Sequence, residues 1–211
     1  MTVVRFIAAL LAVGLGIFFC ARKKQPLFFK ILLFGCASFL LGSIFEGCWT
    51  LVYREMPTGF HIGYLGYMGA YFFFLSAHYG AINRLADGGE KKYRPYRAVA
   101  LIGPVITAAV TIWSVWTQGV LPQLPMLLLA VPIALELYFA IKHLLLPDVE
   151  MGIIKVMRPY NVCVLLLCLS QLVSEMTGLP AAVRMIAGCA VSLILIVLLP
   201  VAETGVQKWY I

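Results

Sequence analysis

The sequence has few charged residues. Only 12% of its 211 residues are Asp, Glu, Lys or Arg, whereas 63% are hydrophobic. A water-soluble domain carries roughly 25% charged residues, so these side chains could not cover a soluble surface. The apolar residues form long continuous runs, unlike the alternating ten-residue strands of a transmembrane barrel. The composition therefore predicts an all-α, polytopic membrane protein with a single domain, residues 1–211.

Several chemical motifs are also missing. The three histidines, His61, His78 and His143, are too far apart to form a metal-binding pair at helical spacing. The six cysteines include no C-x-x-C pair, which disfavours a thiol oxidoreductase. No G-x-S-x-G motif or phosphate loop occurs, and residues 181–201 lack the lysine that a retinal protein would need. The sequence thus predicts no metal, no cofactor and no catalytic residue.

Seven apolar runs are long enough to cross a bilayer, which takes about 20 helical residues. We predict membrane-spanning helices at about 3–20, 27–52, 60–82, 97–117, 122–145, 160–178 and 181–201. Pro26 and Pro159 stand directly before the second and sixth of these spans. The first run is followed at once by the basic sequence ARKK, which indicates a retained helix rather than a cleaved signal peptide. The sequence therefore predicts a seven-helix transmembrane bundle.

Basic residues gather in alternate loops of this predicted bundle. One side carries Arg22, Lys23, Lys24, Arg84, Lys91, Lys92, Arg94, Arg97, Lys142, Lys155, Arg158 and Lys208. The other side carries only Arg5, Arg54 and Arg184. The positive-inside rule makes the first side cytoplasmic, which places the N-terminus outside and the C-terminus in the cytoplasm. Basic loops that face anionic lipid headgroups explain the net charge of +7 without a nucleic-acid partner.

Ionisable side chains inside a membrane are costly, so each one in a span is a candidate functional residue. These candidates are Glu46, Glu136, Glu175, Arg184, His78 and His143. Glu46, Glu175 and Arg184 are predicted near the outer ends of their spans. The other three lie deeper and could form a proton or ion path.

The third predicted span has three distinct faces at 100° per residue. One face carries Tyr64, Tyr67, Tyr71, Phe74 and His78. A small-residue face carries Gly63, Gly66, Ala70 and Ala77, and would let a neighbouring helix approach closely. The third face carries Leu65, Met68, Phe72 and Leu75, which suit lipid. We expect the tyrosine–histidine face to point into the bundle, with His61 off this face at the outer surface.

Polar side chains of several helices are expected to meet near the outer leaflet. The predicted members are Glu46, Trp49, Tyr64, Tyr67, Tyr71, Gln171, Glu175 and Arg184. In one interpretation the cluster is structural: Arg184 pairs with Glu175 or Glu46, and the tyrosines form hydrogen bonds between helices. In the other, the cluster is a binding site for a small or lipidic ligand.

The run EGCWTLVYREMPTGFHIGYLGYMGAYFFFLSA, residues 46–77, resembles the outer hairpin in the multi-span sensory regions of bacterial histidine kinases and diguanylate cyclases. The matching residues are Trp49, Pro57, Tyr64, Tyr67, Gly69 and Tyr71. Tyr64 stands where an acidic residue is common in that family, and the sequence contains no kinase or cyclase domain. The resemblance implies a sensor-like, non-enzymatic module in a bacterial cytoplasmic membrane, whose output needs a cytoplasmic signalling partner.

Two alternative functions remain open from the sequence. The segments FFKILLFGCASFLLGSIFEG and MGAYFFFLSAHY resemble lysoplasmalogenase-type membrane hydrolases, with His78 near their helical histidine. The Gly-Asp pair of that family is replaced here by Phe45-Glu46. A small-solute or proton-coupled transporter would instead need a polar path from Glu46 and Glu175 to Glu136, and on to His78 or His143.

Overall fold

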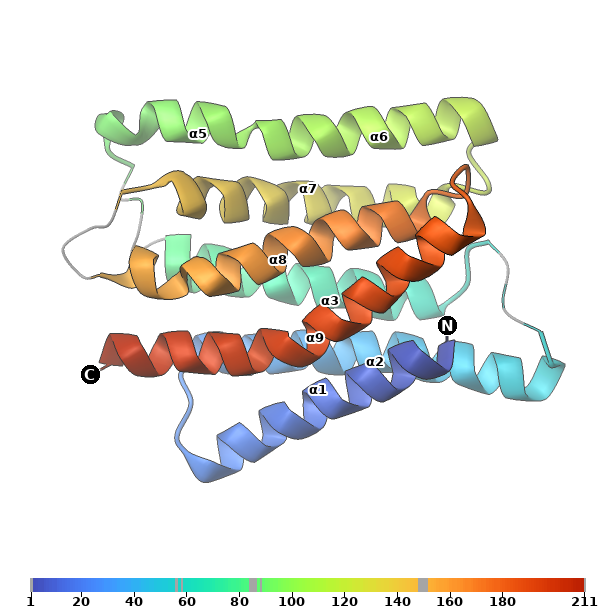
Figure 1. The fold of residues 1–211 in the computed structure, drawn as a ribbon, viewed down its shortest axis with the longest axis horizontal. Helices are drawn as coiled ribbons and strands as arrows, with labels where there is room; N and C mark the ends of the chain where they lie inside the picture. The colour runs from blue at the N-terminus through green and yellow to red at the C-terminus, as the bar shows by residue number, and fades with distance from the viewer. Residues whose placement is uncertain are drawn as a thin grey trace.

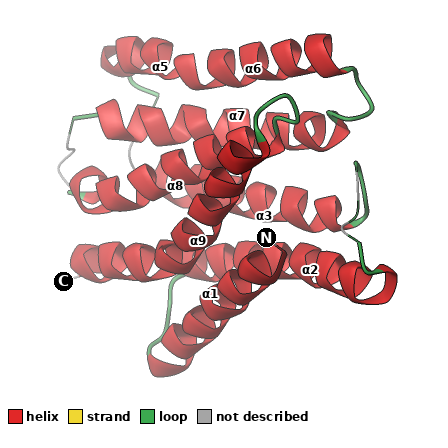
Figure 2. Ribbon diagram, turned by 45° about the vertical axis from the view of Figure 1, so that its right-hand side comes forward, coloured by secondary structure: helices red, strands yellow, loops and turns green. Residues whose placement is uncertain are grey.

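The computed structural model describes residues 2–55, 57, 59–83, 87, 89–147 and 152–210, without the side chains of residues 81, 82, 209 and 210. Its long helices are α1 (Thr2–Arg22), α2 (Leu27–Tyr53), α3 (Gly63–Ala77), α6 (Ile102–Gln118), α7 (Leu124–Leu145), α8 (Ile153–Glu175) and α9 (Ala181–Tyr210). Three short elements lie between α3 and α6: the π-helical turn η1 (His78–Asn83), the 3-10 turn η2 (Lys91–Tyr93) and α5 (Arg94–Ala100). In the described part of the chain these helices are joined only by loops, without a strand (Figure 2).

Six helices form a closed ring. Going around it, α3 contacts α7, α7 contacts α8, α8 contacts α9, α9 contacts α1, α1 contacts α2, and α2 returns to α3. The α6 helix lies outside the ring against α7, and α5 continues its line at one edge of the molecule (Figure 1). Side chains that point into the ring are therefore shielded from lipid, whereas α6 exposes Trp113 and Trp116.

The predicted helical membrane bundle is confirmed at the level of its helices. Within the part of the chain that the structure describes, six segments are long and apolar enough to cross a membrane: Thr2–Arg22, Leu27–Tyr53, Lys91–Gln118, Leu124–Leu145, Ile153–Glu175 and Ala181–Lys208. The predicted span at 60–82 corresponds to α3, which has 15 residues, followed by the π-helical η1. Because α3 alone is shorter than the roughly 20 residues of a full span, the seventh crossing stays a prediction.

The last two helices extend beyond the spans predicted from apolar runs. The α8 helix begins at Ile153 rather than near residue 160, with Pro159 inside it. Proline removes only one backbone hydrogen bond and is tolerated where neighbouring helices cover the gap. The α9 helix similarly continues past residue 201 to Tyr210, with Pro200 inside it. Apolar runs mark the bilayer-sized part of a helix, and a helix can continue beyond that part into water.

The close helix contact predicted for the small-residue face of α3 is confirmed. Ser38 on α2 donates a hydrogen bond of 2.9 Å to the backbone carbonyl of Gly66 on α3. A Cβ atom on Gly66 would lie 2.6 Å from the backbone nitrogen of Gly42, closer than packed atoms allow. The opposite face of α3 exposes Leu65 and Phe72, as predicted. This packing fixes the rotation of α3 and turns its tyrosines toward the ring interior.

The two ends of the bundle differ in charge. The C-terminus and the last turns of α1 and α7 lie at one end, called here the C-terminal end, and the N-terminus lies toward the other, the N-terminal end (Figure 1). Most of the basic residues predicted to be cytoplasmic belong to the C-terminal end, although Arg84 lies outside the described residues.

The carboxylate of Asp87 has two basic partners at the C-terminal end. Asp87 accepts hydrogen bonds from Arg97, at 2.7 and 2.9 Å, and from Lys142, at 3.1 Å. Partial burial alone would raise the pKa of the Asp87 carboxyl, but the hydrogen bonds from Arg97 and Lys142 outweigh it and hold this pKa below its ordinary value. Lys142 also donates a hydrogen bond to Asn83, the last residue of η1. Asp87 and Lys142 thereby attach the end of η1 to α7.

The α2–α3 contact generates a test of the fold. We expect Gly66→Ala to destabilise the protein by about 1–3 kcal/mol, because the added methyl group meets backbone atoms that cannot rotate away. Gly47→Ala is the matched control, since a Cβ atom there has no neighbour within 4 Å among the described residues. Thermal unfolding in detergent micelles measures both variants. Equal stability of the two would contradict the packing described here.

Candidate functional site

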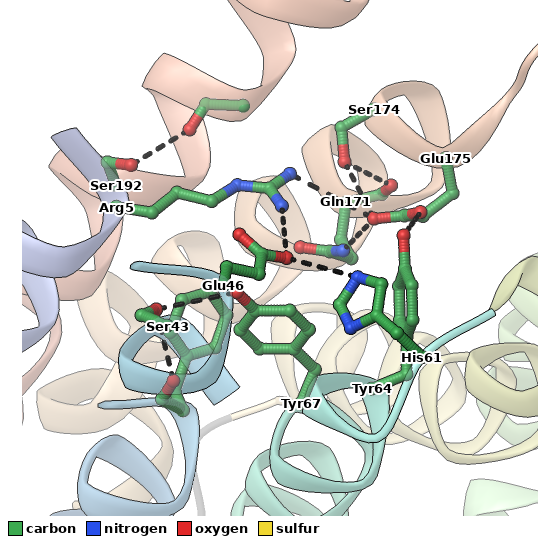
Figure 3. Close-up of polar contacts among 12 residues, drawn as sticks. Arg5, Ser43, Glu46, His61, Tyr64, Tyr67, Gln171, Ser174, Glu175 and Ser192 are labelled. Carbon is green, nitrogen blue, oxygen red and sulfur yellow. Dashed lines mark hydrogen bonds and ion pairs between the residues drawn. The ribbon is translucent and has the colours of Figure 1, made fainter. Parts of the chain in front are cut away.

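A buried arginine lies at the centre of the N-terminal end. Arg5 projects from α1 into the ring, and its side chain is only 7% exposed. Its Nη1 atom lies 3.9 Å from a carboxylate oxygen of Glu46 on α2, and its Nη2 atom lies 3.9 Å from Glu175 on α8 (Figure 3). The guanidinium also faces the ring of Tyr67, at 5.8 Å from the ring centroid. Arg5 thus connects three helices that are distant in sequence.

The two carboxylates beside Arg5 have different surroundings. Glu175 accepts hydrogen bonds from Gln171, at 2.7 Å, and from the phenol of Tyr64, at 3.0 Å, with Ser174 at 3.5 Å. Glu46 has its cationic neighbours farther away: Arg5 at 3.9 Å and Nε2 of His61 at 3.7 Å. A charge-assisted hydrogen bond is typically about 2.7–2.9 Å long. The Tyr67 hydroxyl also interacts with the Glu46 carboxylate. Glu46 therefore has fewer short hydrogen bonds than Glu175 and keeps capacity to accept another.

A cavity of about 510 Å³ opens beside these residues. Its lining includes Arg5, Glu46, His61, Tyr64, Ser174, Glu175, Thr177 and Arg184 as polar residues, and Pro57, Gly59, Pro122, Pro125, Ala181 and Met185 as the others. A volume of 300–1,000 Å³ is typical of sites for small molecules. The residues Arg5, Glu46, His61, Tyr64, Gln171 and Glu175 are called the Arg5 cluster below.

The structure brings most of the predicted outer residues together, with two exceptions. Glu46, Tyr64, Glu175 and Arg184 line the cavity, whereas Tyr67 and Gln171 lie directly behind it in contact with the lining residues. Trp49 instead packs along α2 against Tyr53, with 4.4 Å between ring centroids. Tyr71 lies deeper and is fully buried, without a hydrogen-bond partner for its hydroxyl among the described residues.

The structural interpretation of this site named the wrong cation. It paired Arg184 with Glu175 or Glu46, whereas Arg5 does so, and no ion pair of Arg184 occurs within the described part of the chain. The predicted position of His61, off the tyrosine face at the outer surface, did not include its contact with Glu46, against which its side chain is only 10% exposed. The loop before α3 folds His61 back over Phe45, with their ring centroids 5.5 Å apart. Helical periodicity contains no information about such a loop.

A second polar cluster lies deeper in the ring. Nδ1 of His78 is 2.7 Å from Oε2 of Glu136, and Nε2 of His78 is 2.9 Å from Oδ1 of Asn161. The ring of His143 lies 4.9 Å from that of His78, centroid to centroid. All four side chains are fully buried. His78, Glu136, Asn161 and His143 are called the His78 cluster below. His78 thus bridges α7 and α8 through its two ring nitrogens.

Tightly packed side chains separate the two clusters. Tyr71 and Phe74 are each at most 1% exposed and lie on α3 between Tyr67 and His78, and so between the two clusters. Tyr160 is also fully buried and packs against the ring of His78, at 5.5 Å between ring centroids. The hydroxyl groups of Tyr71 and Tyr160 have no hydrogen-bond partner among the residues that the structure describes. In this conformation the cavity therefore ends at the Arg5 cluster.

Sequence reasoning missed Arg5, His61 and Asn161 as members of these clusters. Arg5 stands early in the first apolar run and was interpreted as a flanking charge that sets orientation. Its position inside the run TVVRFIAALL was the available signal, since a charge followed directly by apolar residues is placed within the membrane zone. Asn161 shares a helical stripe with Gln171 and Glu175, but its partner on α3 depends on packing between helices.

The Arg5 cluster generates a prediction about stability. Arg5→Gln should destabilise the protein by about 3–5 kcal/mol, because two buried carboxylates would lose their shared cation. Arg22→Gln is the matched control, since Arg22 lies on the same helix and is exposed. Unfolding of both variants by SDS titration in mixed micelles measures the difference. If Arg5→Gln lowers the free energy of unfolding by less than about 0.5 kcal/mol, Arg5 does not stabilise the two buried carboxylates, and the prediction is wrong.

Comparison with known proteins adds no assignment. No protein-family model, no curated protein and no solved structure matches this chain. The resemblances to sensory regions and to lysoplasmalogenase-type hydrolases stay predictions from the sequence. The geometry of the two clusters and of the cavity is therefore the basis for a functional proposal.

Proposed function

We propose that the protein is a sensor-like membrane module that binds a small ligand in its N-terminal-end cavity. In this proposal seven helices cross a bacterial cytoplasmic membrane, with the N-terminus outside and α3 with η1 forming the third crossing. The basic loops at the C-terminal end support this orientation. The cavity would then open toward the outside, and the basic loops would meet anionic headgroups of the inner leaflet.

The observation that carries the proposal is the cavity with buried charges in its lining. Arg5, Glu46 and Glu175 are each at least nine-tenths buried and yet border a space of about 510 Å³. Buried charges are expensive to maintain. A purely structural ion pair would favour close packing and short contacts, whereas Arg5 stands 3.9 Å from each carboxylate. Space beside partly satisfied charges is the arrangement expected of a polar binding site.

Binding is favoured over transport by the packing below the cavity. A transporter needs a polar route from the Arg5 cluster to the His78 cluster, and the buried side chains of Tyr71 and Phe74 fill the part of α3 between them. Proton-coupled transport is the second candidate, because His78 and Glu136 form a buried hydrogen-bonded pair and the Tyr71 hydroxyl between the clusters has no hydrogen-bond partner among the described residues. Proton relays in transporters use buried carboxylates and histidines of this kind.

A hydrolase has one of its required contacts but lacks access to it. Glu136 lies within hydrogen-bond distance of His78, as a catalytic His–acid pair would require. Both side chains are fully buried, however, and neither lines the cavity. A lipid substrate could not reach them in this conformation, so the non-enzymatic proposal is preferred.

A sensor also needs an output, and the proposal places it at the C-terminal end. The α3 helix carries Tyr64 at the cavity and passes directly into η1, whose last residue is held by Lys142 of α7. The π-helical geometry of η1 is uncommon and is frequently found at functional positions. A ligand that moves α3 would act on this attachment, next to the loop where a cytoplasmic signalling partner could bind.

A thermal-shift screen tests the proposal. We expect at least one compound of a metabolite and lipid panel to stabilise the wild type, by about 2.7 kcal/mol at 100 times its Kd. Glu46→Gln should abolish that shift while membrane insertion stays intact, because Glu46 lines the cavity with spare acceptor capacity. Glu55→Gln, an exposed carboxylate outside the cavity lining, is the control and should behave as wild type. A panel without any stabilising compound, or a shift unchanged in Glu46→Gln, would refute the binding function.

A further inference from the structure

The cavity lining has equal numbers of positive and negative side chains, located at different positions around the cavity. Among its described lining residues are two guanidinium groups, of Arg5 and Arg184, and two carboxylates, of Glu46 and Glu175. A ligand with one net charge would leave this balanced set with an excess charge in a poorly solvated space. A neutral ligand that carries both a positive and a negative group matches the lining better.

Only one of the two carboxylates is free to bind a ligand cation. Glu175 already receives hydrogen bonds from Gln171 and Tyr64. Glu46 faces Arg5 and His61 at 3.9 and 3.7 Å, beyond hydrogen-bond length, and has the Tyr67 hydroxyl as its hydrogen-bonding neighbour. A carboxylate has about four lone-pair sites, so an ammonium group can approach Glu46 without displacing Tyr67.

Arg184 is the corresponding site for a ligand anion. It stands in the first turns of α9, lines the cavity and is half-buried. Its Nε atom is buried without a hydrogen-bond partner, and within the described chain the guanidinium has no ion pair. Arg5, in contrast, is already shared between two carboxylates. A planar guanidinium with free N–H groups binds a carboxylate with high geometric specificity.

One wall of the cavity is apolar. Pro122 lies just before α7 and Pro125 in its first turn, and Ala181 and Met185 come from the start of α9. Such a surface offers no hydrogen bonds to a polar substituent and gains stability from covering an aliphatic one. Methionine adapts its shape to different aliphatic groups. The cavity thus combines a charged part with an apolar part, next to each other.

We propose that this cavity binds a free α-amino acid with an aliphatic side chain. Its ammonium group contacts Glu46, its carboxylate contacts Arg184, and its side chain lies against the wall of Pro122, Pro125 and Met185. The inference rests on the proposed ligand-binding function and adds the chemical class of the ligand. An ammonium with a phosphate in a lipid headgroup offers related charges, so the test includes that source as a separate arm.

Three matched probes separate the parts of this proposal. L-Leucine carries both charged groups, 3-methylbutylamine lacks only its carboxylate, and 4-methylpentanoate lacks only its ammonium group. In dodecyl maltoside micelles free of lipid, L-leucine should raise the unfolding temperature of the wild-type protein. Neither of the other two probes should do so at the same concentration and pH 7, since each leaves one charged residue of the cavity without a partner.

Two arginine variants locate the carboxylate contact. Arg184→Gln should weaken L-leucine binding at least tenfold, measured by titration calorimetry, and leave the unfolding temperature of the ligand-free protein unchanged. Arg54→Gln removes the same charge from an exposed position at the same end and should bind as wild type. If Arg184→Gln fails to fold, the comparison of the three probes on the wild type still decides the ligand class.

Each outcome of these measurements distinguishes this inference from the proposed function. Equal stabilisation by L-leucine and either half-molecule would overturn the assignment of a zwitterion. L-leucine could have no effect while added phosphatidylethanolamine stabilises the wild type and not Glu46→Gln. That result would identify the ligand as a lipid headgroup instead of an amino acid, and the proposed binding function would stand. Absence of any Glu46-dependent stabilisation, by these probes or by the wider panel, would overturn both.

Discussion

A guanidinium buried within an apolar helix bundle destabilises it by several kcal/mol unless carboxylates compensate the charge. Arg5 has that compensation from Glu46 on α2 and Glu175 on α8. The three helices are held in fixed relation because each contributes one charge to the same place. The tyrosines of α3, Gln171 and the cavity are arranged around this group of charges. The N-terminal end of the bundle therefore depends on the contact between Arg5 and its two carboxylates.

The ring of six helices separates two polar regions with different properties. The Arg5 cluster borders a cavity and has charges at distances that leave room for a ligand. The His78 cluster is fully buried and has short hydrogen bonds between His78, Glu136 and Asn161. Close packing of α2 against α3 keeps Tyr64 at the first cluster and His78 at the second on one continuous helix face. The α3 helix therefore runs from the cavity directly into η1.

Much of this arrangement could be predicted from the sequence, because it follows from helical periodicity. Spacing placed Tyr67, Tyr71 and His78 on one interior face of α3, with small residues beside them, and the structure agrees. Arg5 was missed because a cation near the end of an apolar run is also the usual orientation signal. The contact of His61 with Glu46 was missed because His61 belongs to a loop. The contact of His78 with Glu136 depends on which faces of α3 and α7 meet, and only packing decides that.

A double-mutant cycle between Arg5 and Glu46 tests the central claim most directly. The free energy of unfolding in micelles is measured for wild type, Arg5→Gln, Glu46→Gln and the double variant. Compensation predicts that the double variant loses less stability than the sum of the single losses, with a coupling of about 0.5–3 kcal/mol. Losses that add within about 0.5 kcal/mol would contradict the claim, since Arg5 and Glu46 would then not stabilise each other.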